Sequence, residues 1–471
     1  MSSVRPTSEA HFGTTVPVLV AGAGACGLTA ALAARDAGAE VVVLERSVVP
    51  QGSTSMSSAL IPGPGSRYQR AAGIVDTPQR MYDDLLVKTK GRTDPVVAKL
   101  CTETAAATIE WLADRFGLPF EMAPIWQAFG HSRARMHQLP GGTGEEFIEH
   151  LTAAAEREGI DVITEAHVTQ LFADADGTVT GVRITRPDGG TEDIGCGALI
   201  LATSGFGGNA EMVREHVPEI AEATYFGWEH NRGDAIRWGR ALGAAVRNLD
   251  AYQGFPALAD PHRISMNLEG LSSGGIQVNV HGERFYNECE SPSTGALHVL
   301  RQPGGSVFNI YGQRQFEIAC DRKRTRMADE LGAIKHAATL DELAGMIGVP
   351  AQPLKDAVAE AQRLCATNGA DLWGRRFEPD LVMAPPFHAI RVTGALYHTQ
   401  GGLAIDHEAR VVRENGQALP NLFAGGGAAV GISGPGGAGY LPGNGLLTAT
   451  CLGRAAGSAA ARLVARREAA E

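Results

Sequence analysis

The sequence predicts an α/β fold in two domains, with a parallel sheet at the centre of the first. A short apolar run at residues 16–21 ends in glycine, an alanine-rich helical stretch follows at 28–37, and a β-branched run follows at 41–44. This strand–helix–strand order is typical of a parallel sheet, whose buried strands read as continuous apolar runs. Two further runs of this kind, at 198–202 and 422–423, indicate that the sheet is assembled from distant segments of the chain.

The stretch from residue 253 to residue 388 differs from the rest of the chain in its pattern of predicted strands and helices. It holds turn-rich strands around GGIQVNVHGERFYNE and two helical segments, at 339–347 and 354–364. We therefore expect an inserted α+β domain at 253–388 and a first domain made of residues 1–252 and 389–471. With 471 residues and 44% apolar content, the chain is long enough for this organisation.

Composition and charge argue against several classes of partner. The formal net charge of −11 and the lack of a lysine or arginine run argue against nucleic acid. The seven cysteines show no CxxC and no metal-ligand spacing, so we expect reduced thiols and no metal. The sequence has no apolar stretch of membrane length and no signal-peptide core, so we expect a cytoplasmic protein without a membrane partner.

Three glycines follow the first predicted strand with the spacing GxGxxG. Gly22 suits the tight turn, Gly24 lets the backbone approach a pyrophosphate, and Gly27 lets the helix pack on the strand. The helix N-terminus then presents unpaired N–H groups to phosphate oxygens. Glu45 stands 23 residues after Gly22, where a carboxylate can accept both ribose hydroxyls. Together these features predict a Rossmann-like domain that binds a dinucleotide.

A second glycine-rich segment, GISGPGGAGYLPGNGLLTATCLGRAAG, leads near Asn444 into a long helix, in which Gly453 and Gly457 allow close packing. A helix N-terminus aimed at the N1/C2 carbonyl of a flavin would stabilise the negative charge that reduction places there. Tyr440 stands just before this helix. Its phenol is either a proton donor that polarises a carbonyl or a packing residue.

Between these glycine-rich segments, several motifs follow in a fixed order: RMHQLPGGTGEEFIEHL, ATSGFGGN, RGDAIRWGRALGA, GGIQVNVHGERFYNE and YHTQGGLAID. Through these motifs the chain resembles the fumarate reductase/succinate dehydrogenase flavoprotein family, which includes the 3-ketosteroid dehydrogenases. The resemblance covers most of the chain. It implies a Rossmann-like FAD-binding domain with an inserted α+β capping domain, and hydride transfer between flavin N5 and a substrate carbon.

Two departures from the family narrow the activity. The fumarate-reducing members carry an arginine a few residues after the NE pair (287–288), where this sequence has Pro292, and a second arginine where it has Tyr440. Losing both removes the bidentate, charge-assisted grip that a dicarboxylate needs. The segment around Tyr440 is similar instead to a motif of the ketosteroid 4-dehydrogenases. That likeness implies Tyr440 as the acid/base, with the backbone N–H groups of Gly443 and Asn444 holding the substrate carbonyl oxygen.

His398, in YHTQGG, matches the histidine of the HTxGG motif that binds substrate in the family. A histidine taken alone is more often a structural residue, but inside this motif we expect a catalytic role beside Tyr440. Tyr397 and Thr399 flank His398, and the resemblance implies that they bind substrate.

The predicted FAD contacts gather at the glycine-rich turns and at the ends of the predicted strands. They are Gly22, Gly24, Ala25, Cys26, Gly27, Glu45, Arg46, Ser53, Thr54, Ser57, Ser58, Val168, Thr203, Ser204, Gly205, Asn209, Gly233, Asp234, Gly402, Gly425, Gly426, Gly443, Gly445, Leu446 and Leu447. Residues 52–60 contain no histidine, and the respiratory members attach FAD covalently there, so we expect non-covalent binding. No CxxCH haem motif occurs, so we expect an unidentified, diffusible electron acceptor or donor.

Three functions compete. The sequence favours an FAD-dependent dehydrogenase, or an ene-reductase in the reverse direction, that introduces or reduces a carbon–carbon double bond next to a ketone, in a ketosteroid or a smaller cyclic ketone. The first alternative is a fumarate/urocanate-type reductase of an unsaturated carboxylate that uses Arg133, Arg135 or Arg263. The second is a non-enzymatic flavin carrier or redox sensor. The inserted domain and the His398 motif argue against it, because both indicate a substrate cleft.

Overall fold

The computed structural model describes residues 3–124 and 128–470. The chain forms two compact units, and each has its own hydrophobic core. The first unit contains Met1–Val217, Gly227–Tyr252 and His398–Glu471, and the second contains Pro218–Phe226 and Gln253–Tyr397. The α/β class that the sequence predicts is confirmed.

A sheet of nine strands, counted over the described ranges, lies at the centre of the first unit. Its main path runs β1–β8–β9–β10–β2–β3–β7, β20 pairs with β10, and β19 pairs with β20. The strands are β1 (Val4–Pro6), β2 (Phe12–Ala21), β3 (Val41–Leu44), β7 (Asp161–Ile163), β8 (His167–Ala173), β9 (Val179–Thr185), β10 (Thr191–Leu201), β19 (Arg410–Val412) and β20 (Ala418–Ala424).

The strands predicted at 16–21, 41–44, 198–202 and 422–423 all lie in this sheet. The strand–helix–strand unit consists of β2, α1 (Ala25–Asp36) and β3, with β2 and β3 parallel. Strand β10 is central, because its Leu199 pairs in parallel with Leu19 of β2 and with Leu422 of β20. The expectation that distant segments build one sheet is therefore confirmed.

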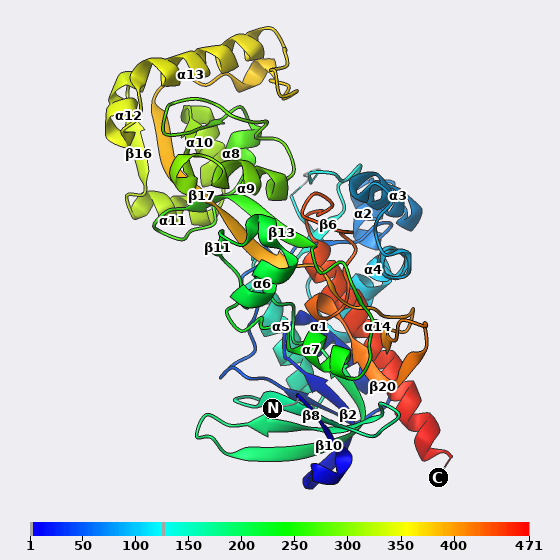
Figure 1. Ribbon diagram of the computed structural model, residues 1–471. Helices are drawn as coiled ribbons and strands as arrows, with labels where there is room; N and C mark the ends of the chain where they lie inside the picture. Colours follow the sequence, from blue (N-terminus) through cyan, green and yellow to red (C-terminus); the bar gives the residue numbers. More distant parts are fainter. Residues whose placement is uncertain (1–2, 125–127, 471) are drawn as a thin grey trace. The chain divides into compact units, whose positions relative to one another are not determined.

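Helix α14 (Asn444–Glu468), the long red helix in Figure 1, packs closely on α1. A Cβ on Gly453 would lie 2.5 Å from Cys26 O, and a Cβ on Gly457 would lie 2.0 Å from Ala30 O. Both distances are too short for a side chain. Glycine at these two positions lets the helix backbones touch, as the sequence predicts.

The remaining elements of the first unit are short, apart from α4. They are α2 (Arg67–Ala71), α3 (Pro78–Thr89), α4 (Pro95–Phe116), α5 (Gly144–Arg157), α6 (Ala210–His216), α7 (Asp234–Ala241), β4 (Ile61–Pro62), β5 (Glu121–Met122), β6 (Met136–Gln138), β12 (Val246–Arg247) and β18 (Gly402–Leu403). Helix α3 begins where Thr77 accepts a hydrogen bond from the Arg80 N–H, with Pro78 in the first turn. Within the described ranges, no helix is both long and apolar enough to cross a membrane.

The second unit is an α+β unit built on a mostly antiparallel sheet. The strand order is β11–β17–β15–β14, and β13 and β16 also pair with β17. Its elements are β11 (Thr224–Tyr225), β13 (Tyr252–Ala259), β14 (Ile276–Val278), β15 (Ser306–Tyr311), β16 (Ile334–Ala337), β17 (Phe387–Thr399), α8 (Glu269–Ser272), α9 (Pro292–Leu300), α10 (Gln313–Cys320), α11 (Lys323–Glu330), α12 (Leu340–Ile347) and α13 (Ala351–Ala366). Helices α12 and α13 are the two helical segments expected at 339–347 and 354–364.

The limits of the second unit differ from the boundaries that composition suggests. Strand β17 crosses the expected boundary at 388/389 without a break, because it pairs with both β15 and β16 on either side of that point. Residues 218–226 also join the second unit, since β11 pairs with β17. A boundary inside a continuous strand leaves no change in composition to detect.

Candidate cofactor and active site

The glycine-rich turn after β2 is as tight as its spacing predicts. Gly22 has a φ of 105°, which favours glycine, and its N–H donates to Leu44 O at 2.7 Å. A Cβ on Gly22 would lie 2.5 Å from Ala202 O, and a Cβ on Gly27 would lie 1.8 Å from Gly22 O. Both positions therefore require glycine, because a side chain would force the helix away from the turn.

Helix α1 begins at this turn with a buried N-terminus. Its N-cap residue, Gly24, offers no side chain as a cap. The N–H of Ala25 donates to Thr54 Oγ1 at 3.0 Å, and the next two N–H groups precede the first intrahelical bond, from Leu28 N–H to Gly24 O. A buried helix N-terminus with open N–H groups suits the phosphates of a dinucleotide.

Glu45 follows β3 and is nearly buried. Its Oε2 accepts a hydrogen bond from the Ala23 N–H at 2.9 Å, and its Oε1 accepts one from the Ser47 N–H at 2.8 Å. These two bonds fix the direction of the carboxylate. Each oxygen keeps a further lone pair, so Glu45 can still accept hydrogen bonds from ribose hydroxyls.

Several parallel strands end at one edge of the sheet. Strands β2, β3, β10 and β20 are parallel to one another. Each is followed within two residues by a predicted cofactor residue, which is Gly22, Glu45, Thr203 or Gly425, respectively. Open α/β sheets bind ligands outside the carboxyl ends of their strands. The fold therefore gathers the predicted cofactor residues at the edge where a ligand is expected.

Two of the buried polar atoms of the first unit that lack a hydrogen-bond partner among the described residues belong to predicted site residues. They are Thr203 Oγ1 and Asn444 Oδ1. A buried polar atom without a partner costs about 1–3 kcal/mol, so a bound group with matching donors would stabilise both. A flavin dinucleotide carries such donors in its ribityl and ribose hydroxyls and its N3–H. The residues at this site fit FAD.

The serine-rich loop that follows β3 is held by its own hydroxyl groups. Ser53 Oγ accepts from Asn231 Nδ2 at 2.9 Å, and Ser57 Oγ donates to Thr54 O at 2.7 Å. Ser58 is exposed. The hydroxyl groups that the sequence assigned to the cofactor thus form hydrogen bonds within the protein, and these bonds order the loop beside α1.

Asn209, Gly233 and Asp234 stand at the starts of α6 and α7. Asn209 Oδ1 accepts from the N–H groups of the first turn of α6 at 3.2 Å, so its side chain is a helix cap. Asp234 and Val168 line one pocket of about 590 Å³ together with Trp238. Every predicted cofactor residue lies in the first unit.

His398 is oriented by a chain of hydrogen bonds. Gln400 Nε2 lies 2.8 Å from His398 Nδ1, Ser433 Oγ lies 3.0 Å from Gln400 Oε1, and Asn444 Nδ2 lies 3.1 Å from Ser433 Oγ. The nearer partner of Nδ1 is the Gln400 amide, since Thr399 O lies 3.4 Å away; an amide N–H only donates, so Nδ1 of His398 accepts and Nε2 carries the proton. The chain of donors therefore ends at His398 Nε2–H.

Tyr440 and His398 form an edge-to-face ring pair, with ring centroids 5.8 Å apart. Burial lowers the pKa of His398 to about 4, so the imidazole is neutral near pH 7. Burial raises the pKa of Tyr440, although a hydrogen bond from the Gly443 backbone opposes this. A Cβ on Gly445 would lie 3.6 Å from His398 Cε1, which places the pair beside the first turn of α14.

The backbone N–H groups expected to hold a substrate carbonyl are engaged within their own loop. The Asn444 N–H donates to Leu441 O at 3.2 Å, and the Gly443 N–H bonds Tyr440. The N–H groups of Gly445 and Leu446 instead precede the first intrahelical bond of α14 and remain available in its first turn. The role expected of Gly443 and Asn444 therefore needs other donors.

The two neighbours of His398 differ in their surroundings. Thr399 is buried, and its Oγ1 accepts from the Phe206 N–H at 3.1 Å, so it holds the turn after β10. Tyr397 belongs to the second unit, where its hydroxyl bonds Ser265 and its ring stacks on Phe255 at 4.9 Å. The structure gives both side chains structural partners, and their predicted contact with substrate stays a prediction.

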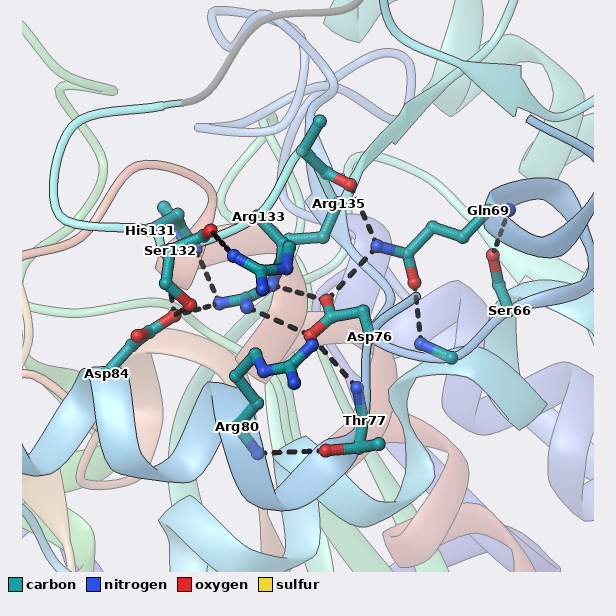
Figure 2. A network of polar contacts seen from close by, with 12 residues as sticks. Ser66, Gln69, Asp76, Thr77, Arg80, Asp84, His131, Ser132, Arg133 and Arg135 are labelled. Carbon is teal, nitrogen blue, oxygen red and sulfur yellow. Dashed lines mark hydrogen bonds and ion pairs between the residues drawn. The ribbon is translucent and has the colours of Figure 1, made fainter. Parts of the chain in front are cut away.

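The arginines considered for a carboxylate substrate have very different environments. Figure 2 shows Arg135, which is fully buried, between Asp76 and Asp84 at N–O distances of 2.8 and 2.6 Å. Arg133 is exposed and donates to Ser132 O at 2.7 Å. Arg263, in the second unit, is exposed and donates to Tyr225 O at 3.1 Å. The charge of Arg135 is already balanced, so it has none to offer a substrate.

Sequence reasoning missed several residues around the active-site pair. Gln400 and Ser433 orient His398, and His131 contacts the loop that follows Tyr440, at Pro442 O. The HTxGG match marked only the histidine, although the glutamine inside it was a visible signal. In the parts of the chain that the structure describes, no group of three or more His, Cys, Asp or Glu could hold a metal ion.

This arrangement of residues is similar to that of known FAD-binding proteins. The sequence profile of the family described as FAD binding domain matches residues 17–446. A probable fumarate reductase of Shewanella frigidimarina is 28% identical over 450 residues, covering 95% of this chain and 75% of that protein. The open conformation of a flavocytochrome c3 fumarate reductase has a TM-score of 0.83 at 27% identity, covering 96% of this chain and 79% of that one.

A second solved structure matches over nearly the whole of both chains. It is the 3-ketosteroid-Δ4-(5α)-dehydrogenase from Rhodococcus jostii RHA1 in complex with 4-androstene-3,17-dione. Its TM-score is 0.78 at 25% identity, and the match covers 98% of this chain and 99% of that one.

Proposed function

The chain belongs to the family described as FAD binding domain, and we propose that it introduces or reduces a carbon–carbon double bond next to a ketone. It is an FAD-dependent oxidoreductase acting on CH–CH bonds, so the non-enzymatic alternative falls away. The predicted family resemblance and FAD as the cofactor are confirmed. The ketone substrate and the roles of individual residues are the proposal.

The observation that carries the proposal is the uncharged pair of Tyr440 and His398 beside α14. Burial keeps the phenol protonated and the imidazole neutral near pH 7. An uncharged pair of donors suits the oxygen of a ketone. It suits a dicarboxylate poorly, because a dicarboxylate needs charge-assisted, bidentate partners.

Each residue of the pair has one role in this proposal. His398 donates Nε2–H to the ketone oxygen, which makes the neighbouring C–H acidic and replaces the donors expected at Gly443 and Asn444. Tyr440 gives a proton to the α-carbon in reduction or removes it in dehydrogenation. Because burial favours the protonated phenol, Tyr440 is better suited to donate, which is the direction of double-bond reduction. When bound, FAD supplies or accepts the hydride at the β-carbon.

The test is anaerobic reaction of the dithionite-reduced holoenzyme with 4-androstene-3,17-dione and with smaller cyclic enones. We expect the enone to reoxidise the flavin. Tyr440→Phe should slow this step by about 100-fold or more while FAD stays bound. Tyr311→Phe is the matched control, because Tyr311 is equally buried but lies in the core of the second unit. An unchanged rate in Tyr440→Phe would refute the role of Tyr440, and no reaction with any enone would refute the ketone substrate.

A reductase of an unsaturated carboxylate is the alternative, and the similarity to a probable fumarate reductase supports it. It needs a cationic residue for the carboxylate. Arg135 is neutralised by two carboxylates, so the exposed Arg133 and Arg263 are the better candidates. Turnover of fumarate with a reduced dye, lost in either Arg133→Gln or Arg263→Gln and retained in the other, would favour this alternative.

A further inference from the structure

A buried polar network lies beside the loop that carries Tyr440. Arg135 binds Asp76 through two nitrogens, at 2.8 and 3.1 Å, and donates to Asp84 at 2.6 Å (Figure 2). Asp84 also accepts the Ser132 N–H and hydroxyl, both at 2.9 Å. Burial raises the pKa of Asp84, but the bonds from Ser132 and Arg135 outweigh it and hold this pKa below its usual range. The two carboxylates thus keep Arg135 in one position.

His131 connects this network to the loop. Arg135 Nη1 lies 3.2 Å from His131 Nδ1, and His131 Nε2 lies 3.0 Å from Pro442 O. A guanidinium has no acceptor, so Nδ1 must accept, and a carbonyl oxygen has no hydrogen, so Nε2 must donate. Both contacts are satisfied only by the neutral imidazole with its proton on Nε2. The position of Arg135 therefore selects the tautomer of His131.

The same short segment meets the loop at two more points. A Cβ on Gly130 would lie 2.4 Å from Leu441 Cδ2, and a Cβ on Gly443 would lie 3.3 Å from Met136 Sδ. Side chains and backbone of residues 130–136 thus pack against residues 441–443 on both sides of the His131 bond. The loop has little room to shift once that bond is made.

A proton relay does not explain the network. A proton would have to pass through Arg135, which stays protonated, and through the carbonyl oxygen of Pro442, which has no proton to give. The contacts instead have a positioning role. The buried ion pairs of Arg135 fix the imidazole of His131, and this imidazole fixes the carbonyl group of Pro442.

We propose that His131 is a positioning residue for Tyr440, fixed by Arg135 and holding the loop 440–443 through Pro442 O. The inference rests on the proposed function, in which the phenol of Tyr440 reacts with substrate. Loss of the His131 bond should misplace the phenol while the cofactor site around Gly22 and Glu45 stays intact.

The experiment compares His131→Phe, which keeps a ring but no hydrogen bond, with His131→Gln, whose amide can accept from Arg135 and donate to Pro442 O. His137→Phe is the matched control. His137 is also fully buried and nearby, but it bonds Ser66 and two backbone carbonyls outside the loop. The readouts are the limiting rate of flavin reoxidation by 4-androstene-3,17-dione, the apparent Kd of that probe, FAD content, Tm, and hydrogen–deuterium exchange of residues 439–444.

We expect His131→Phe to lower the limiting rate by about tenfold, with bound FAD retained and the probe's Kd changed much less. Exchange in residues 439–444 should rise. His131→Gln should restore the rate to within about threefold of the parent, and His137→Phe should lower Tm without a comparable loss of rate or rise in exchange.

Equal rates and equal exchange in His131→Phe and the parent would overturn the inference. So would a loss of rate in His137→Phe as large as that in His131→Phe, because that outcome would trace the effect to general destabilisation. If the parent itself does not react with any enone while exchange still rises only in His131→Phe, the proposed function is wrong, but the role of His131 in holding the loop 440–443 is supported.

Discussion

Gln400 donates its side-chain amide to the imidazole of His398, with Nε2 and Nδ1 2.8 Å apart, and so places the proton of His398 on Nε2. Ser433 donates its hydroxyl to Oε1 at the other end of the amide, at 3.0 Å. One neutral histidine thus presents a donor because its neighbour two residues along the chain can only donate to it.

Replacing Gln400 should disturb His398 without removing it. Gln400→Leu keeps the volume but frees the tautomer of His398, so we expect the rate of flavin reoxidation by an enone to fall by roughly tenfold. Gln417→Leu, in an exposed turn, should leave the rate unchanged. Stopped-flow absorbance of the flavin measures both, and equal rates in the two variants would contradict the role given to Gln400.

FAD should be released from the denatured protein, because we expect non-covalent binding. Precipitation with acid should leave the yellow colour in the supernatant. Glu45→Gln should weaken FAD binding by roughly tenfold or more, because a neutral amide accepts more weakly and can no longer receive both backbone N–H groups as a carboxylate does. Fluorescence of the released flavin gives both results, and colour that remains in the precipitate would contradict the expectation.

Adding one methyl group at the contact of α1 and α14 should be costly. Gly457→Ala places a Cβ 2.0 Å from Ala30 O, so we expect the free energy of unfolding to fall by about 1–3 kcal/mol. Gly345→Ala, in α12, meets nothing within 4 Å and should stabilise the chain by about 0.5–1 kcal/mol. Urea unfolding of the two variants tests the sign of each effect, and a neutral Gly457→Ala would show that the helices can move apart.

Breaking the buried ion pairs of Arg135 should destabilise the first unit strongly. Asp76→Asn leaves a buried guanidinium with only one carboxylate, and we expect a loss of about 3–5 kcal/mol. Asp114 forms a shorter pair with Arg67, 2.6 Å long, but both side chains are largely exposed, so Asp114→Asn should cost far less. Similar losses in the two variants would contradict this contrast, which rests on burial.

The protein should become less stable as the pH is lowered below neutrality. Burial lowers the pKa of both His131 and His137 to about 4, whereas the unfolded chain titrates near its ordinary value of about 6.5. Between these values the unfolded state binds protons that the folded state does not, so the free energy of unfolding decreases as the pH falls through this window. Above about pH 6.5 this contribution is fully present. Urea unfolding at a series of pH values from about 7.5 to about 4.5 gives the free energy of unfolding as a function of pH. In His137→Gln this free energy should decrease less steeply as the pH falls, and an unchanged pH dependence would contradict the assignment.

Much of the fold could be predicted from the sequence because the signals are local. The apolar run of β2, the glycines at 22, 24 and 27, and the acid at 45 each follow from the chemistry of a few neighbouring residues, and the structure places them as expected. Helix α14 and its glycines at 453 and 457 are likewise readable from one segment. The limit between the two units at 397/398 could not be predicted in this way, because it depends on which strands pair with β17.

By itself, the sequence determined the FAD-binding sheet and which residues are chemically suited to the site, since glycine conformation, strand periodicity and family motifs are properties of short stretches. Only the tertiary structure decided how those residues are engaged. It occupied the N–H groups of Gly443 and Asn444 within their own loop, neutralised Arg135 with two aspartates, and brought His131 to Pro442, 311 positions along the chain. The physical reason is that a side chain's partner is set by which distant segments pack together, and burial then makes each of those partnerships costly to break.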